Sequence, residues 1–63
     1  MMKPDLEVRR YKNHWALLAT VEGRTQIRPF HYKADAQKAL EEFSFYTPFQ
    51  LEAEFNHYFQ PLS

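Results

Sequence analysis

The chain has 63 residues, no net charge at neutral pH and no cysteine, which excludes a disulfide-stapled scaffold and a thiolate metal site. A domain of this length buries only about 60% of its unfolded surface, and we expect its six Phe, four Tyr and one Trp residues to compensate by dense packing. No apolar run approaches the roughly 18 residues of a membrane span, and no apolar signal-peptide region is found. We therefore expect a cytoplasmic protein without a membrane partner.

Three antiparallel strands are predicted in the first half of the chain, over residues 6–12, 14–21 and 25–33. The first strand alternates in polarity, and the turn at Lys12-Asn13 leads to the second, since Asn13 tolerates a left-handed conformation. The turn at Glu22-Gly23 is the strongest signal, because the only glycine of the chain stands where a positive φ is needed. Pro29 cannot donate a ladder hydrogen bond, so the third strand is expected to be an edge or bulged there.

Two-residue turns fix the register of these strands, with Val8 opposite Leu17 and Trp15 opposite Phe30. Because side chains alternate with period two, one face of the sheet is the candidate core. We call it the core face, and it carries Leu6, Val8, Trp15, Leu17, Ala19, Val21, Phe30 and Tyr32. We call the opposite side the outer face, and it carries Arg9, Tyr11, His14, Ala16, Leu18, Thr20, Ile27, Pro29 and His31. Arg10 and Arg28 share the parity of the core face and are expected at its rim.

A helix is predicted over residues 33–46, with Asp35 capping its first turn. The apolar side chains of this segment recur with the i, i+3, i+4, i+7 spacing of one helical stripe. That stripe consists of Ala36, Ala39, Leu40 and Phe43, and the opposite side of the helix carries Gln37, Lys38, Glu41 and Glu42. We expect the stripe to lie across the core face of the sheet.

The segment after residue 46 allows two interpretations. Residues 47–50, Thr-Pro-Phe-Gln, have the form of a capping box with proline at the first helical position, and strong helix formers follow. The same segment also alternates in polarity, which predicts a fourth strand instead, with one face made of Leu51, Ala53, Phe55, His57 and Phe59. We favour a helix that ends before Pro61. The predicted fold class is α+β: a three-stranded antiparallel sheet packed on one helix, then a second helix or a fourth strand, in one domain over residues 1–63.

Signals of catalysis are nearly absent. The chain has no cysteine nucleophile, its single glycine cannot form a phosphate-binding loop, and Ser44 and Ser63 stand in no motif. We expect no enzyme activity, no cofactor and no small-molecule substrate. His14 and His31 become cross-strand neighbours, close enough to share a metal ion if His57 or a carboxylate completed the site. Two partly exposed imidazoles beside Tyr11 are the commoner arrangement, so no metal site is predicted.

The centre of the outer face is unusually apolar, with Ala16, Leu18, Ile27 and Pro29. Either the segment carrying Leu51, Phe55 and Phe59 folds over this centre, or a partner covers it. A small, neutral, aromatic-rich chain without an active site suits an accessory or inhibitor protein of a phage or mobile element, by analogy of size. We therefore expect a non-catalytic module that binds another protein or a second copy. Its expected contact residues are Arg9, Tyr11, His14, Leu18, Ile27 and His31.

The distribution of charge favours an alternative function. Residues 1–33 hold seven Lys and Arg residues against three Asp and Glu residues, a net charge of +4, whereas residues 34–63 hold one against five, a net charge of −4. A basic half suits duplex DNA, because neutralising phosphates releases condensed counterions. The expected nucleic-acid contacts are Arg9, Arg10, Lys12, Arg24 and Lys33.

A resemblance to a known family points the same way. Trp15-Ala16, Gly23-Arg24, Phe30 and the helix start Asp35-Ala36-Gln37-Lys38-Ala39-Leu40 resemble the AP2-like, arm-type DNA-binding domains of phage and transposon integrases, over roughly residues 8–46. The resemblance implies a three-stranded antiparallel sheet with one helix behind it. It also implies a sheet that binds in the major groove of DNA.

Overall fold

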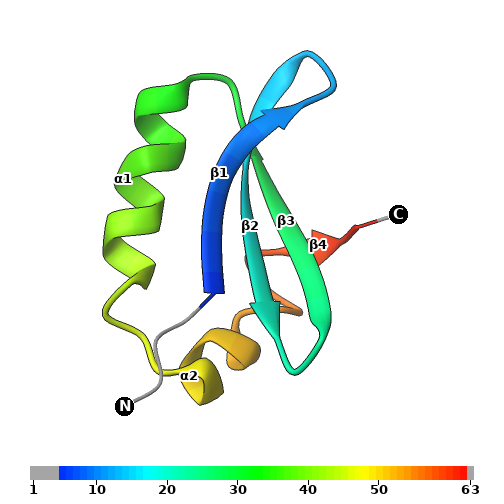
Figure 1. The fold of residues 1–63 in the computed structure, drawn as a ribbon, viewed down its shortest axis with the longest axis vertical. Helices are drawn as coiled ribbons and strands as arrows, with labels where there is room; N and C mark the ends of the chain where they lie inside the picture. Colours follow the sequence, from blue (N-terminus) through cyan, green and yellow to red (C-terminus); the bar gives the residue numbers. More distant parts are fainter. Residues whose placement is uncertain (1–4, 63) are drawn as a thin grey trace.

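The computed structural model describes residues 5–62 and shows the predicted α+β fold (Figure 1). Four antiparallel strands form one sheet in the order β1-β2-β3-β4. The strands are β1 (Asp5–Tyr11), β2 (His14–Val21), β3 (Arg24–Phe30) and the short β4 (Gln60–Pro61). Two helices follow β3 along the chain, α1 (Lys33–Phe43) and α2 (Pro48–Ala53). No helix within residues 5–62 is long and apolar enough to cross a membrane.

The predicted register of the three long strands is confirmed. Val8 pairs with Leu17, Trp15 with Phe30, and Leu18 with Ile27. The β2–β3 turn has positive φ at both central residues, Glu22 (52°) and Gly23 (80°), as a type I′ hairpin turn requires. In the β1–β2 turn the left-handed residue is Lys12 (φ 57°) rather than the expected Asn13.

The third strand is shorter than predicted, because it ends at Phe30 and the chain bends at His31 and Tyr32 before α1. The strand parity that placed Tyr32 on the core face therefore stops applying, and its side chain is 70% exposed. The short β4 pairs only with Gln26 and Ile27 of β3. At Pro29 the strand is consequently an edge within the described chain, as its missing N–H predicted.

The stripe of α1 packs on the core face as expected, with Ala36, Ala39 and Phe43 buried. The expected cap is wrong: Tyr32 is the N-cap residue and makes no side-chain cap hydrogen bond, while Asp35 lies within the first turn. An acidic side chain there still interacts favourably with the helix dipole. The helix ends at Phe43, earlier than the predicted end at residue 46.

The helix interpretation of the carboxy-terminal segment is confirmed for Pro48–Ala53, whereas the strand predicted from the alternation of residues 51–59 does not form. The capping box forms: the Gln50 N–H donates to the Thr47 hydroxyl at 3.1 Å, and the Thr47 N–H donates to the Gln50 side chain at 2.9 Å. The helix that it starts ends at Ala53, turns follow over residues 54–58, and the chain then pairs with β3 as β4. Pro61 was expected to mark the end of the helix. The helix ends well before it, and Pro61 lies in β4 opposite Gln26.

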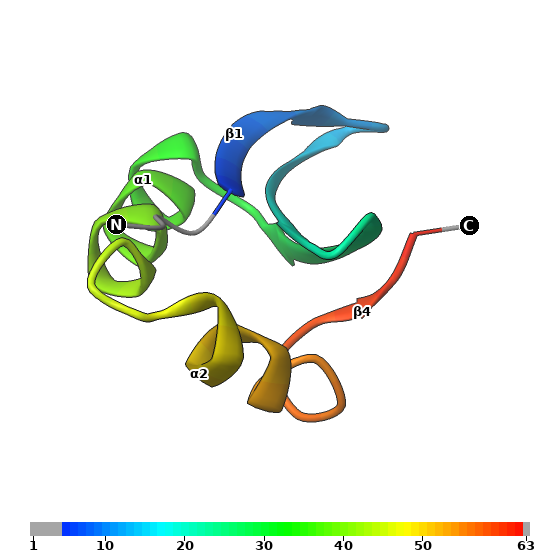
Figure 2. The same cartoon turned by 60° about the horizontal axis from the view of Figure 1, so that its bottom comes forward.

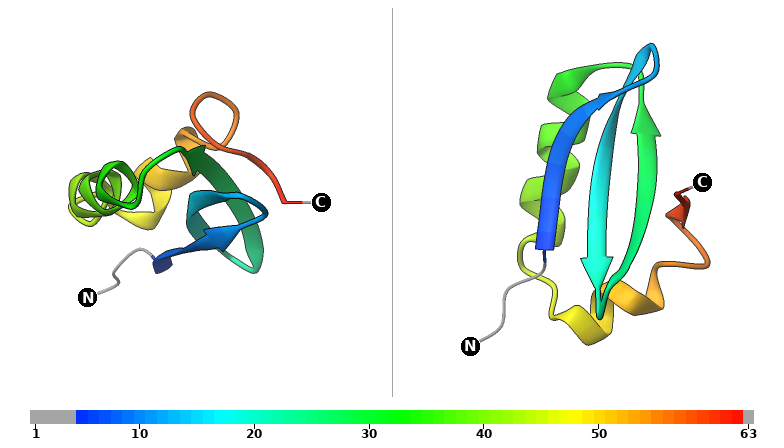
Figure 3. Two further views of the ribbon diagram at one scale, coloured as in Figure 1. Left: turned by 90° about the horizontal axis from the view of Figure 1, so that it is seen from above. Right: turned by 45° about the vertical axis from the view of Figure 1, so that its right-hand side comes forward.

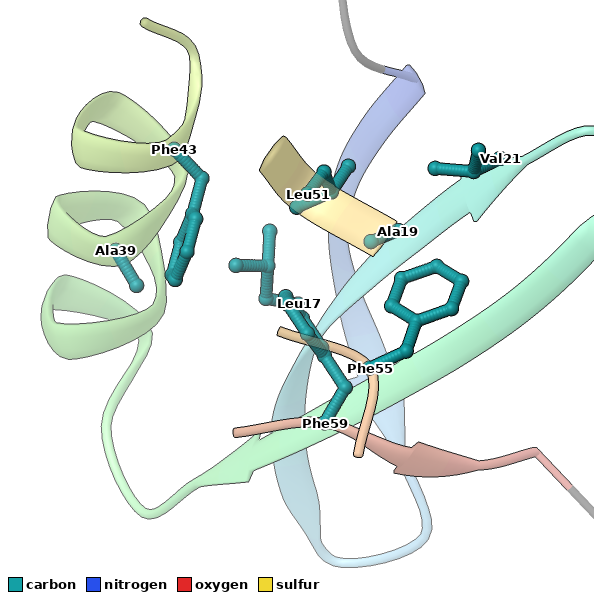
Figure 4. Packing of buried hydrophobic residues seen from close by; sticks show 8 residues of the cluster. All are labelled: Leu17, Ala19, Val21, Ala39, Phe43, Leu51, Phe55 and Phe59. Carbon is teal, nitrogen blue, oxygen red and sulfur yellow. The ribbon is translucent and has the colours of Figure 1, made fainter. Parts of the chain in front are cut away.

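The main hydrophobic core lies between the core face and both helices (Figure 4). Leu17, Ala19 and Val21 of β2 meet Phe43 of α1, and the carboxy-terminal segment adds Leu51, Phe55 and Phe59. The Phe43 ring centroid lies 4.7 Å from that of Tyr46, 5.2 Å from that of Tyr58 and 5.4 Å from that of Phe59. These contacts supply the dense aromatic packing that a chain of this size needs.

Candidate functional site

The two helices pack on the core face of the sheet, and neither packs on the outer face. Leu51, Phe55 and Phe59 pack with Leu17 and the other core-face residues, so the carboxy-terminal segment does not fold over the outer face. Both helices lie on the same side of the sheet (Figure 2), and within residues 5–62 no helix covers the other side. No helix within residues 5–62 therefore covers the predicted interface, and the exposure of its individual residues decides which of them a partner can reach.

The centre of this face is apolar but only partly exposed. Leu18 lies opposite Ile27, and Ala16 lies opposite Pro29. Ala16 is fully buried and Ile27 is 1% exposed, whereas Leu18 is partly exposed and Pro29 is exposed. Ile27 lies between Leu18 on β2 and Gln60 on β4. Ile27 exposes almost no surface in the isolated chain, so the apolar residues of the centre that a partner could contact directly are Leu18 and Pro29.

Polar side chains surround this centre. At one end of β2 the Thr20 and Thr25 hydroxyls are 2.8 Å apart and share a hydrogen bond. On β1, Arg9 Nε lies 3.3 Å from a carboxylate oxygen of Glu7, and both side chains are mostly exposed. Tyr11 pairs with His14 at the other end. The outer face thus has an apolar centre within a polar rim.

The two histidines are neighbours, as predicted. The His14 and His31 ring centroids are 5.4 Å apart with the rings nearly perpendicular, and both residues are exposed. With Pro29 and Phe30 they line a shallow depression of about 140 Å³. Among residues 5–62 no three His, Cys, Asp or Glu side chains are grouped so as to hold a metal ion. Within these residues the pair has no third ligand, and its exposed imidazoles lie at the rim of the outer face.

Formal charge is scarce on the outer face. By strand parity, Asp5, Glu7 and Arg9 are its charged side chains within β1–β4, a net charge of −1. The other arginines of the sheet, Arg10, Arg24 and Arg28, have the parity of the core face. Arg28 lies at its rim as expected, with its guanidinium 4.4 Å from the centre of the Tyr58 ring.

The predicted nucleic-acid contacts do not form one surface. Arg10 and Lys33 each place a cationic group over the Trp15 ring, at 5.3 and 5.2 Å from its centre, and Lys12 lies 5.4 Å from the Tyr11 ring. We call Arg10, Lys12 and Lys33 the basic end of the molecule. Trp15 is only partly buried and is not part of the main core, and its ring contacts two of these cations.

Arg24 is separate from the basic end. It lies at the β2–β3 turn, where Nη1 is 3.1 Å from a carboxylate oxygen of Glu52, and its guanidinium is 5.4 Å from the Phe55 ring. The turns at the two ends of β2 are eight residues apart along the strand, or about 26 Å at 3.3 Å per residue. Arg24 is therefore held by α2 and the turn after it, at the far end from Lys12.

A hollow near the β2–β3 turn was missed by sequence reasoning. It has a volume of about 550 Å³, and Val21, Thr47, Pro48 and Phe49 are among the residues that line it. Phe49 is 82% exposed and Phe45 is 87% exposed. One feature of the sequence could have indicated these exposed side chains: neither Phe45 nor Phe49 belongs to an apolar helical stripe. Asp5, Glu22 and Glu52 also line the hollow, and they make this end of the molecule acidic.

Comparisons with known proteins give no further guide, since no family model, no curated protein and no solved structure matches the chain. The function must be argued from the surfaces themselves.

Proposed function

We propose that this chain is a non-catalytic module that binds another protein through the outer face of its sheet. The observation that supports this function is that Leu18 and Pro29 expose apolar surface at the centre of the outer face, with a polar rim around both. An apolar centre within a polar rim is the usual anatomy of a protein–protein interface. An accessory or inhibitor protein of a phage or mobile element fits this role.

Charge supports a protein partner over nucleic acid on this face. Its formal charges, from Asp5, Glu7 and Arg9, add up to −1, and Glu7 already pairs with Arg9. Binding to duplex DNA draws its affinity from basic side chains that neutralise phosphates. The outer face carries one arginine and two carboxylates, so it has no such source of affinity. In a DNA complex its apolar centre would lie against the charged phosphate backbone of the DNA.

Leu18 is the expected anchor of the interface, and Tyr11 is an expected contact at its rim. Both side chains are partly exposed and lie on neighbouring strands of the same face. Large side chains near the middle of an interface contribute most of its binding energy once the partner excludes water. His14 and His31 would contribute hydrogen bonds at one margin.

Photo-crosslinking tests this proposal. The variant Leu18→benzoylphenylalanine carries a photoreactive group on the outer face, and Gln37→benzoylphenylalanine carries it on the exposed side of α1 as the matched control. We expect position 18 alone to cross-link a protein partner in the cells that produce the chain, and nuclease treatment to leave the adduct unchanged. Equal cross-linking from both positions, adducts that nuclease removes, or no protein adduct at position 18 would contradict the proposal.

A second candidate function, binding to duplex DNA, is favoured by one observation. Arg10, Lys12 and Lys33 gather with two aromatic rings at the basic end of the molecule. The resemblance to arm-type integrase domains also implies DNA binding. In those domains the sheet binds the DNA, whereas in this chain the basic side chains gather at one end of the sheet. Side chains in such an end would contact phosphates and so bind DNA without sequence preference.

Salt dependence tests the second candidate. If the basic end neutralises phosphates, replacing Arg10, Lys12 and Lys33 by Ala lowers the slope of log K against log salt by about 0.9 for each phosphate that is no longer neutralised. Arg24→Ala is the matched control, because Arg24 is paired with Glu52 at the far end. Absence of binding at low salt, or an equal reduction of the slope in both variants, would exclude the basic end as a DNA site.

A further inference from the structure

The strand β1 is a free edge of the sheet. It pairs with β2 along all seven of its residues, and within residues 5–62 no strand pairs with its other side. The ribbon views agree, since β1 and β4 stand at opposite ends of the sheet (Figure 3, right). An edge strand presents a row of unpaired N–H and C=O groups that can pair with another strand. A seven-residue edge is long enough to support such pairing.

The sequence of β1, Asp-Leu-Glu-Val-Arg-Arg-Tyr, is complementary to itself in one antiparallel register. If two copies of β1 pair around Val8, Glu7 of each copy lies opposite Arg9 of the other. The two-fold axis produces this opposite-charge pair twice, as an isologous interface requires. The same register places Val8 opposite Val8.

Other registers that keep the two outer faces on one side are less favourable. Pairing around Arg9 places two arginines opposite each other, and pairing around Leu6 places Asp5 opposite Glu7. Pairing around Glu7 forms two Asp5–Arg9 pairs but places the two Glu7 side chains opposite each other, so only the register around Val8 has opposite-charge pairs without a like-charge pair. Like charges directly opposite destabilise a pair of strands, whereas opposite charges stabilise it. The charge pattern of β1 therefore selects the register around Val8.

The side chains that would make these contacts are available. Glu7 and Arg9 have side chains that are 54% and 60% exposed, and each already lies beside the other within one strand at 3.3 Å. Exchanging this pair for two pairs between copies needs little rearrangement. On the core face, Leu6 and Val8 are partly buried against the main core. Pairing would remove more of their apolar surface from water.

We propose that two copies of the chain associate through β1, antiparallel and centred on Val8, to form one continuous sheet of eight strands. The dimer leaves both outer faces uncovered, so it is independent of the proposed function. It would place the two outer faces side by side on one surface. In each copy the edge at β1 would then be closed by a partner strand.

Charge reversal tests the dimer by sedimentation of the full chain. The wild type is expected to be a dimer. Glu7→Arg and Arg9→Glu each turn two attractive pairs into two repulsive pairs, so each variant should weaken association about tenfold or more. An equimolar mixture of the two variants should dimerise again, because the new arginine of one faces the new glutamate of the other. Circular dichroism of each variant should match that of the wild type, which would show that the loss of association is not caused by unfolding.

The control is Leu18→Glu, which changes the outer face and should leave this dimer intact. A dimer that survives in Leu18→Glu while protein binding is lost separates the two proposals. A wild-type chain that stays monomeric, or a mixture of the two charge-reversal variants that stays monomeric, would overturn the pairing around Val8. Dissociation caused by Leu18→Glu would overturn it too, because the outer face would then form the dimer.

Discussion

Leu18 and Ile27 lie directly opposite each other on β2 and β3, yet Ile27 is 1% exposed while Leu18 keeps part of its side chain in solvent. The same chemical change at these two positions should therefore have opposite consequences. This difference defines which part of the outer face a partner can contact.

We predict that Leu18→Glu leaves the chain folded and that Ile27→Glu unfolds it. A carboxylate at position 18 can reach water, but at position 27 it would be buried without a partner, which is costly. The milder Ile27→Ala should lower the free energy of unfolding by about 2–5 kcal/mol. Urea unfolding followed by circular dichroism measures all three. If Leu18→Glu also unfolds the chain, the outer face is closed and the interface must lie elsewhere.

Phe43 should be the most sensitive position of α1. It is 7% exposed and its ring contacts those of Tyr46, Tyr58 and Phe59. Phe43→Ala should cost about 3–5 kcal/mol, which is most of the stability of a small domain. Phe45→Ala is the control two residues away, and at 87% exposure it should change stability by no more than about 0.5 kcal/mol. Equal melting temperatures for the two variants would show that α1 does not pack as described.

The backbone of the β2–β3 turn is strained at Glu22, and a substitution there should relieve the strain. Glu22 adopts φ 52°, a left-handed conformation that side chains other than Gly, Asn and Asp rarely accept. Glu22→Asn should raise the free energy of unfolding by up to about 1 kcal/mol. Glu22→Gln is the matched control, because it removes the same charge and keeps the strained side chain. A gain that is equal in both variants would assign the effect to charge, and no gain in either would show that the turn is unstrained.

Local chemistry explains why so much of the fold was predictable. Two-residue turns at Lys12-Asn13 and Glu22-Gly23 leave only one register, so the pairing of Trp15 with Phe30 follows from sequence alone. The stripe of α1 has one face that can be buried, and the capping box at Thr47 marks a helix start whatever its surroundings. In each case the determining residues are close together in the chain.

The errors arose where distant contacts decide the structure. Tyr32 was assigned by strand parity, but β3 ends two residues earlier, at Phe30, and Tyr32 is the N-cap residue of α1. The segment after Ala53 turns and then pairs as β4 with Gln26 and Ile27, a contact across more than thirty residues that no local pattern indicates. Ile27, which alternation alone placed on an exposed face, is paired on both sides by β2 and β4 and is 1% exposed.

For the candidate site, sequence identified the outer face and its apolar centre, but it could not show which basic residues share a surface. Arg24 has the same type of side chain as Arg10, and only the fold places one beside Glu52 and the other beside Trp15. The contacts of a long basic side chain depend on which acidic or aromatic groups the fold places near it.

The most direct test of the protein-binding function is affinity capture from cells that produce the chain, comparing wild type, Leu18→Glu and Gln37→Glu. Both variants add one negative charge, but only position 18 lies on the outer face. We predict that wild type and Gln37→Glu retain the same protein in the presence of nuclease, and that Leu18→Glu, although folded, loses it. Retention of that protein by folded Leu18→Glu, or its loss from wild type upon nuclease treatment, would contradict the account.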